Sequence, residues 1–243
     1  TAEQGDPYLL QSQLAFDSLE RVEAFAAALR EVMARHDILR TSVLWEGLTT
    51  PVQVVWREAI VPLQEVELDP ADGPVIEQLH ALFNARAYRL DVSQAPLMRL
   101  VYARDPAMER VVGILLFHHL AMDHIALEVM RGELQASLCG HTVALAPPVP
   151  YRNYVAQTRL GVSEQEHEAF FRAQLADIDE PTLPFGLQEV QGDGRGIDEA
   201  QQALPTDVYQ RLSTQARQAG VSVASLIHLA WARVLAATSG QQR

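Results

Sequence analysis

The sequence of 243 residues contains no lysine, and its 19 basic residues are all arginine, against 31 aspartates and glutamates. Its formal net charge is therefore −12. Proteins that bind nucleic acid contact the phosphates through a basic face, and binding to an anionic membrane surface also relies on clustered basic residues. The shortage of basic residues argues against nucleic acid and against a membrane surface as partners.

Cysteine is nearly absent as well, since Cys139 is the only one. One cysteine cannot form an intramolecular disulfide, and it excludes a zinc site built from several cysteines. No opening segment resembles a signal peptide, and the longest apolar run, residues 111–116, is far too short to cross a membrane. We therefore expect a protein of the reducing cytoplasm. Because the first residue, Thr1, is not a methionine, we also expect a piece of a longer chain.

The remaining composition, with 48% apolar and 21% charged residues, is typical of a globular protein. Alternating or β-branched apolar runs predict strands over residues 8–16, 38–45, 52–56, 61–66, 96–103 and 110–117, with another strand starting at 203–204. Apolar residues at helical spacing predict helices over residues 19–35, 75–88, 123–138, 164–176, 207–219 and 223–237. Since strands alternate with helices, the sequence predicts a mixed α and β fold.

Two adjacent histidines, His118 and His119, follow the most apolar of the predicted strands, and Asp123 comes next at the start of a predicted helix. Neighbouring residues at the end of a strand point to opposite faces, so only one of the two imidazoles can face a given cavity. The other has to turn inward and find hydrogen-bond partners. A carboxylate at the start of a helix is stabilised by the exposed backbone amides there. The pattern suits one positioned imidazole that moves a proton near neutral pH.

Spacing alone leaves two interpretations of these three residues open. They can form a catalytic site, or they can form a hydrogen-bonded structural cluster. A metal site is disfavoured, because metal ligands must share one face and adjacent residues rarely do.

Four segments resemble, in the same order, motifs of the condensation domains of nonribosomal peptide synthetases. Residues 117–123 (FHHLAMD) resemble the family's His-His-x-x-x-Asp-Gly signature, and residues 35–43 (RHDILRTSV) resemble its Arg-His-Glu-x-Leu-Arg-Thr-x-Phe motif. Residues 150–154 (PYRNY) are similar to its Tyr-x-Asp-Tyr segment, and residues 221–240 to a helix early in its second lobe. The resemblance implies an α/β fold of the chloramphenicol-acetyltransferase type, an α+β sandwich in which helices pack on a mixed sheet.

The resemblance also implies an activity and a set of partners. Condensation domains join two substrates that are held as thioesters: the acceptor's amine attacks the donor's thioester carbonyl, and an amide forms. No metal or bound cofactor is expected, because the substrates arrive on the phosphopantetheine arms of donor and acceptor carrier proteins. An adenylation domain of the same synthetase is a further expected neighbour.

The family's site roles carry over to the matching positions. His119 matches the functional histidine, which holds the attacking amine or takes a proton from it. His118 matches a structural histidine. Asp123 matches a structural aspartate that faces an arginine, and the resemblance favours Arg35 for that pairing over Arg40, which can equally be a solvated charge.

The motif departs from the family at one position, where His124 replaces glycine. An imidazole there could narrow the substrate tunnel, or it could point outward. The departure keeps two alternatives open, a non-catalytic platform that binds carrier proteins and an epimerisation-type relative. An acyltransferase that uses coenzyme A fits less well, because the acidic charge balance is poor for a diphosphate ligand.

We assign residues 1–180 to the first lobe, and residues 181–243 to the inter-lobe linker and the start of the second lobe. The boundary rests on residues 181–198, which are rich in proline, glycine and aspartate. Family segments expected before residue 1 and after residue 240 are missing. We therefore expect the remainder of the second lobe to be a partner, and we expect little or no condensation activity from the chain alone.

Several residues outside the motif carry plainer expectations. The three tryptophans could line a hydrophobic tunnel, but the core is the favoured prediction, because large aromatic side chains usually pack there: Trp45, Trp56 and Trp231. His228 is also predicted to be a core residue, since it lies on the apolar face of its helix. Glu128 and Glu133, on the helix that follows the histidines, are expected to face solvent.

Overall fold

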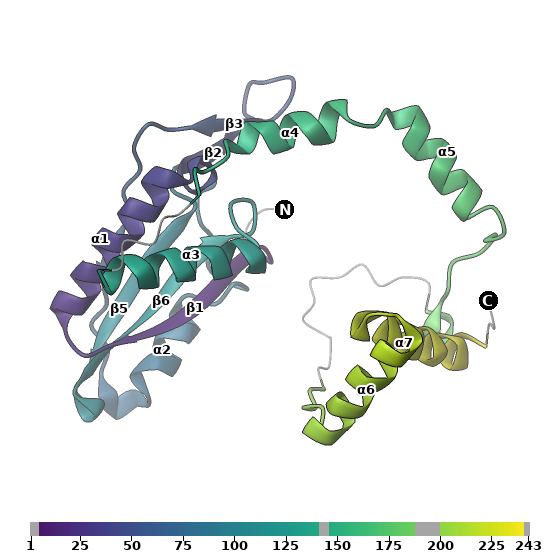
Figure 1. Ribbon diagram of the computed structural model, residues 1–243. Helices are drawn as coiled ribbons and strands as arrows, with labels where there is room; N and C mark the ends of the chain where they lie inside the picture. The colour runs from purple at the N-terminus through teal and green to yellow at the C-terminus, as the bar shows by residue number, and fades with distance from the viewer. Residues whose placement is uncertain (1–4, 141–145, 188–199, 241–243) are drawn as a thin grey trace. The chain divides into compact units, whose positions relative to one another are not determined.

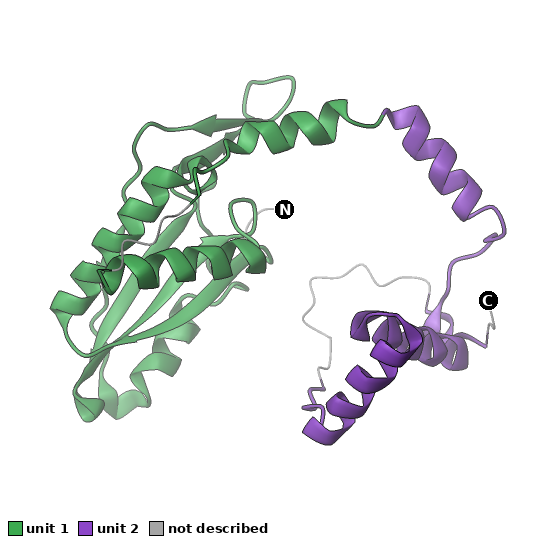
Figure 2. Ribbon diagram, in the orientation of Figure 1, with its two compact units in different colours: residues 1–162 green, residues 163–243 purple. Residues whose placement is uncertain are grey.

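The computed structural model describes residues 5–140, 146–187 and 200–240 (Figure 1). The chain divides into two compact units, residues 1–162 and residues 163–243 (Figure 2). The division precedes the lobe boundary that the sequence places at residues 180 and 181. Part of the segment on which that boundary rests, residues 188–198, lies outside the described residues, and the lobe assignment stays a prediction.

The first unit is built on a four-stranded mixed sheet with the strand order β1-β6-β5-β4. Strand β6 (Arg110–His118) pairs antiparallel with β1 (Leu9–Phe16) on one side and with β5 (Met98–Asp105) on the other. Strand β4 (Leu63–Glu65) pairs parallel with β5. All four strands were predicted from the sequence within a few residues, and the mixed sheet is confirmed.

Strand β6 is the centre of the core, because every residue after Arg110 in it is buried. Its alternate side chains enter two hydrophobic clusters, one on each face of the sheet. The side chains of one face are Val111, Leu115 and Phe117, and those of the other face are Val112, Ile114 and Leu116. Burial on both faces explains the continuous apolar run in the sequence.

Helices cover both faces of this sheet, as Figure 1 shows. Helices α1 (Leu19–Arg35) and α3 (His124–Leu138) pack on one face, and the shorter α2 (Val75–Leu82) packs on the other. Ser18 occupies the N-cap position of α1, but its side chain makes no capping hydrogen bond. Helix α2 ends earlier than predicted, because the side chain of Asn84 accepts the amide of Arg86 and its carbonyl accepts two further amides in a turn.

The segment predicted as one strand over residues 38–45 is a turn followed by a shorter strand. A 3₁₀ helix, η1 (Asp37–Arg40), precedes β2 (Thr41–Leu44), which pairs antiparallel with β3 (Val52–Val55). The turn directs the apolar side chain of Leu39 into the core, where it is buried. The apolar residue at this position is therefore explained by a buried side chain in a turn, and not by the alternating inward and outward side chains of a strand.

The structure contains a helix that the sequence did not predict, α4 (Tyr151–Leu160). None of its residues is buried, so it carries little of the apolar periodicity by which helices are recognised. Two further 3₁₀ turns, η2 (Pro70–Asp72) and η3 (Pro106–Met108), occupy predicted loops.

The second unit contains α5 (Glu164–Gln174), a 3₁₀ turn η4 (Pro184–Gly186), α6 (Thr206–Ala219) and α7 (Val223–Ser239). The side chains of Ser163 and Ser222 cap the starts of α5 and α7. Helix α6 instead has Pro205 at its N-cap position, and residues 203–204 form no strand.

Few apolar side chains of these helices are covered. Among the described residues of α5, α6 and α7, only Ala216 is buried. No single helix in the described part of the chain is long and apolar enough to cross a membrane. Helices α6 and α7 meet the length and composition only as a pair, and they are bent by 104° at the break.

Candidate functional site

His118 is held inside the protein by hydrogen bonds to both ring nitrogens. Its Nε2 lies 3.1 Å from Oδ2 of Asp6, and its Nδ1 accepts the backbone amide of Leu120 at 3.0 Å. Because Nδ1 is an acceptor, the ring proton is on Nε2 and is donated to the carboxylate. Both His118 and Asp6 are buried, and the ring of Tyr8 lies beside the imidazole. The expected structural role of His118 agrees with this geometry.

Asp6 reaches His118 because the chain at Gly5 passes very close to the segment after α2. The amide of Asp6 donates to the carbonyl of Ala85 at 2.6 Å. Gly5 has φ of 79°, and a side chain there would place its Cβ 2.2 Å from that carbonyl oxygen. The sequence did not reveal Asp6, because its partner His118 lies more than a hundred residues away. A glycine directly before an aspartate was the only local signal.

His119 faces the opposite way and is exposed. Its backbone amide donates to the carbonyl of Tyr8, which continues the pairing of β1 with β6 by one residue. The residue lines a cavity of about 520 Å³. The cavity's other walls come from η1, from the loop and first turn of α3, and from the start of α4 with the residues just before it: Ile38, Leu120, Ala121, Met122, Asp123, Ala126, Val149, Pro150, Tyr151 and Tyr154. Of the two histidines, the structure therefore exposes His119 to the cavity.

Asp123 caps helix α3 and does not pair with Arg35. Its Oδ1 accepts the amide of Ala126 at 2.8 Å, as a helix N-cap does. Arg35 contacts Glu133 of α3 instead, with Nε 3.0 Å from Oε2. The predicted Asp123–Arg35 pair is wrong, because the amides at the start of α3 already hold the carboxylate and Glu133 lies closer to the end of α1. Arg40, the alternative, donates to the backbone carbonyl of Trp56.

Glu133 is buried, so the expectation that it faces solvent is also wrong. Besides Arg35, it has Nε2 of His36 at 3.0 Å from its Oε1. Burial raises the pKa of Glu133, but hydrogen bonds and positive charge from Arg35 and His36 outweigh it and hold the pKa below the usual value of 4.5. Glu128, by contrast, is exposed and pairs with Arg131.

Two tyrosines at the start of α4 form a wall of the His119 cavity, and neither was singled out from the sequence. The rings of Tyr151 and Tyr154 lie 5.5 Å apart. Burial raises the pKa of Tyr151, and negative charge on Tyr154 and Asp123 raises it further. The only sequence signal for these residues was the resemblance of residues 150–154 to the family's Tyr-x-Asp-Tyr segment.

His124 is the first residue of α3 and is exposed. It is not among the residues that line the His119 cavity. The geometry is thus consistent with an outward-facing side chain. In the described part of the chain, no group of three histidine, cysteine, aspartate or glutamate side chains is placed to hold a metal ion.

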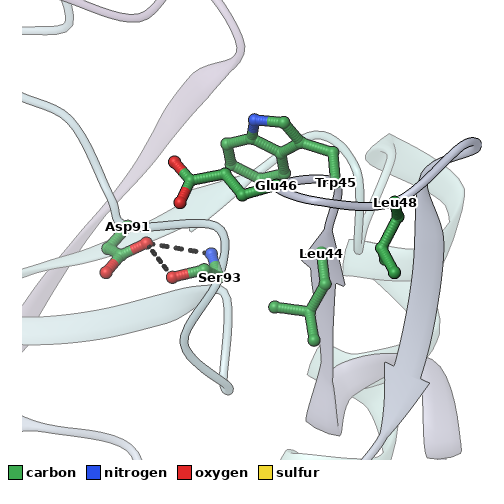
Figure 3. A pocket seen from close by; sticks show the side chains of 6 residues that line it. All are labelled: Leu44, Trp45, Glu46, Leu48, Asp91 and Ser93. Carbon is green, nitrogen blue, oxygen red and sulfur yellow. Dashed lines mark hydrogen bonds between the residues drawn. The ribbon is translucent and has the colours of Figure 1, made fainter.

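The tryptophans are not core residues, contrary to expectation, because each is about half exposed. Trp45 lines a separate cavity of about 500 Å³, shown in Figure 3, where the side chain of Glu46 lies beside its indole ring and Asp91 lies farther away, next to Ser93. One carboxylate oxygen of Asp91 accepts both the amide and the hydroxyl of Ser93. His228 in α7 is exposed as well.

Comparison with known proteins identifies the family to which this fold belongs. The model of the condensation-domain family matches residues 1–243. The chain belongs to the condensation-domain family. Among curated proteins, malpinin synthetase of Mortierella alpina is 50% identical over 239 residues, which are 98% of this chain and 3% of that synthetase. Malpibaldin synthetase of the same organism is 47% identical over 240 residues, 99% of this chain and 4% of the synthetase.

Solved structures confirm the condensation-domain fold. The cyclization-docking bidomain of the EpoB synthetase from Sorangium cellulosum matches with a TM-score of 0.71 and 22% identity, over 96% of this chain and 47% of the bidomain. The first condensation domain of the calcium-dependent antibiotic synthetase matches with a TM-score of 0.68 and 19% identity, over 98% and 56% of the two chains. The condensation-domain chain described here thus spans about half the length of these solved structures and a few per cent of the curated synthetases.

Removing the carboxylate of Asp6 should destabilise the condensation-domain core. In Asp6→Ala the buried Nε2–H of His118 loses its acceptor, and Asp6→Asn has one carbonyl oxygen where two separate donors now use two oxygens. Each variant should lower the free energy of unfolding by about 1–3 kcal/mol, measured by urea denaturation. Asp17→Ala, an exposed control, should change it by less than about 0.5 kcal/mol. Equal stabilities of the Asp6 and Asp17 variants would contradict the role of Asp6.

The Glu133 cluster should make stability depend on pH. Because the folded pKa lies below 4.5, the ionised carboxylate stabilises the fold fully above about pH 4.5, and this contribution is lost as the pH falls through the lowered value. Glu133→Gln should therefore cost about 1–3 kcal/mol at pH 7, and the difference from the unsubstituted chain should shrink below pH 4.5. Urea denaturation across pH 3 to 7 measures it. Glu128→Gln, on the same helix, should cost less than about 0.5 kcal/mol at every pH. A pH-independent loss in Glu133→Gln would refute the ionic contribution.

Proposed function

We propose that this chain carries the histidine side of an active site that forms amide bonds in nonribosomal peptide synthesis. The observation that carries the proposal is that the two adjacent histidines lie in different environments. His118 is buried and hydrogen-bonded on both nitrogens, whereas His119 is exposed and lines a cavity of about 520 Å³. Membership of the condensation-domain family supplies the class of reaction.

The proposed reaction transfers a carrier-bound acyl or peptidyl group to the amine of an acceptor thioester. The amine nitrogen forms a bond to the thioester carbonyl carbon, and collapse of the tetrahedral intermediate breaks the carbon–sulfur bond. His119 holds the amine in line with the carbonyl and takes the proton that the nitrogen loses, which then passes to the leaving thiolate. Positioning contributes more than deprotonation, since a neutral amine is already a nucleophile.

The neighbouring residues are proposed to support His119 without contacting substrate. His118, locked to Asp6, fixes the end of β6 and hence the direction of the next side chain. Asp123 fixes the start of α3 by capping it, which holds the other end of the loop. Arg35 supports the site through Glu133 rather than through Asp123. His124 takes no part, because it does not line the cavity.

The complete enzyme is proposed to need more than this chain. Residues 1–180 would form the first lobe, and residues 181–243 would begin a second lobe that the rest of the domain completes. This chain matches only 56% of the first condensation domain of the calcium-dependent antibiotic synthetase, which supports the proposal. The exposed apolar side chains of α5 to α7 support it as well. Donor and acceptor carrier proteins would present phosphopantetheine-bound substrates, beside an adenylation domain of the synthetase, in the cytoplasm.

Replacing His119 should remove catalysis without unfolding the domain. In the complete condensation domain, His119→Ala should lower the rate of amide formation between loaded carrier proteins about 100-fold or more. The melting temperature should hardly change, because the side chain is exposed. His124→Ala, at the end of the same motif, should retain activity. Undiminished turnover by His119→Ala would remove this residue from the mechanism.

The chain of 243 residues should be inactive when isolated. If substrate contacts come from both lobes, the cavity beside His119 lacks part of its wall. The same carrier-loading assay, with mass-spectrometric detection of the condensed product, measures this. Peptide formation by the isolated chain at the rate of the complete domain would disprove it.

A further inference from the structure

Helix α4 forms a wall of the His119 cavity, yet it contributes no fully buried residue and no part of the hydrophobic core. Tyr151 and Tyr154 line the cavity, together with Val149 and Pro150 just before the helix. None of the ten residues of α4 is buried. The two hydrophobic clusters on the sheet contain no residue of α4. Polar contacts with other elements therefore become important for where this wall lies.

The start of α4 is capped by a residue from a distant part of the chain. Pro150 occupies the N-cap position and has no side-chain acceptor for the free amides of the first turn. Asp37 supplies the missing acceptor, since its Oδ1 and Oδ2 lie 3.0 and 3.2 Å from the backbone nitrogen of Tyr151. A carboxylate is well suited to this position, because the amide end of a helix is electropositive.

The segment that leads into α4 is tied to the same place. The Nη2 of Arg35, at the end of α1, donates to the backbone carbonyl of Ala146 at 3.0 Å. Arg35 is in turn held by the buried carboxylate of Glu133. Glu133 belongs to α3, the helix that starts at the end of the His119 loop. We refer to Arg35, Asp37 and Glu133 as the α1 clasp.

From these contacts we propose that the α1 clasp positions the α4 wall against His119, and that Asp37 is a positioning residue for the acyl transfer. Arg35, the last residue of α1, and Asp37, the first residue of η1, hold both the approach to α4 and its first turn. Ile38, the residue after Asp37, lines the same cavity. This inference rests on the proposed function of His119 for its effect on catalysis, but not for its effect on α4.

A purely structural role makes a different prediction from a positioning role. Since α4 contributes nothing to the hydrophobic core, loss of the Asp37 contact should leave the core intact and displace only the wall. Displacement of a substrate-contacting wall by about 1 Å can change a rate by about 100-fold. A cap that mattered only for stability would instead lower the melting temperature and leave the kinetic constants of the folded enzyme alone.

The test uses Asp37→Ala and Asp37→Glu in the complete domain. Glutamate keeps the carboxylate on a side chain that is longer by one methylene group. Asp37→Ala should lower kcat/KM for the loaded carrier protein about 10- to 100-fold, mainly through kcat, and Asp37→Glu should restore most of it. The control is Asp69→Ala, which removes the carboxylate that caps η2. Asp69 does not line the His119 cavity and is distant in sequence from the residues that do. The kinetic constants of this variant should be unchanged.

Amide hydrogen exchange provides a readout that does not depend on activity. In Asp37→Ala the amides of α4 should exchange at least about 10-fold faster, while those of β6 stay protected. Unchanged exchange in α4, or an unchanged kcat in an active domain with Asp37→Ala, would overturn the proposal. If the complete domain forms no amide at all, the proposed function fails, and the exchange of α4 alone still decides whether Asp37 holds the wall.

Discussion

The hydrogen bond between His118 and Asp6 decides which of two chemically identical side chains meets the cavity. Strand β6 is buried on both faces up to its last residue, so a histidine at its end has to be satisfied inside the protein. Asp6 and the amide of Leu120 do this from opposite sides of the ring and fix a single tautomer. Because neighbouring side chains of a strand point to opposite faces, the inward position of His118 directs His119 outward, to the edge of the cavity.

The surroundings of His119 are built from the ends of helices and strands rather than from the middle of any element. β6 ends at His118, α3 starts at His124, α1 ends at Arg35 and α4 starts at Tyr151. Helix and strand ends leave backbone amides and carbonyls without partners, and here charged side chains satisfy them. Asp123 does so within its own helix, whereas Asp37 and Arg35 do so for a segment more than a hundred residues away. Hydrogen bonds from these side chains to the backbone groups at element ends thus connect the walls of the cavity.

Local pattern was enough to predict most of the first unit. Apolar runs and helical spacing were enough to locate β6, α1 and α3. The buried positions of these elements require apolar residues, and those residues form the pattern that is visible in the sequence. The contacts that cross the sheet were not predictable in this way. Asp6 and Glu133 looked like ordinary charged residues, because nothing in their neighbourhood reports a partner so distant in the chain. Trp45 was misjudged for the converse reason, as a hairpin can expose an aromatic residue that usually lies in a core.

The misassigned arginine pair shows how a resemblance and a physical argument differ in what they specify. The family motif indicated that an arginine near the end of α1 matters, and the structure agrees that Arg35 is engaged. It did not specify the partner, and the choice follows from desolvation. Asp123 is exposed at the start of a helix, where backbone amides already compensate its charge, so it gains little from a guanidinium. Glu133 is buried, and a buried carboxylate without positive partners would be costly. Arg35 therefore stabilises the fold most where it lies, and through Ala146 the same guanidinium links this buried charge to the wall of the cavity that His119 faces.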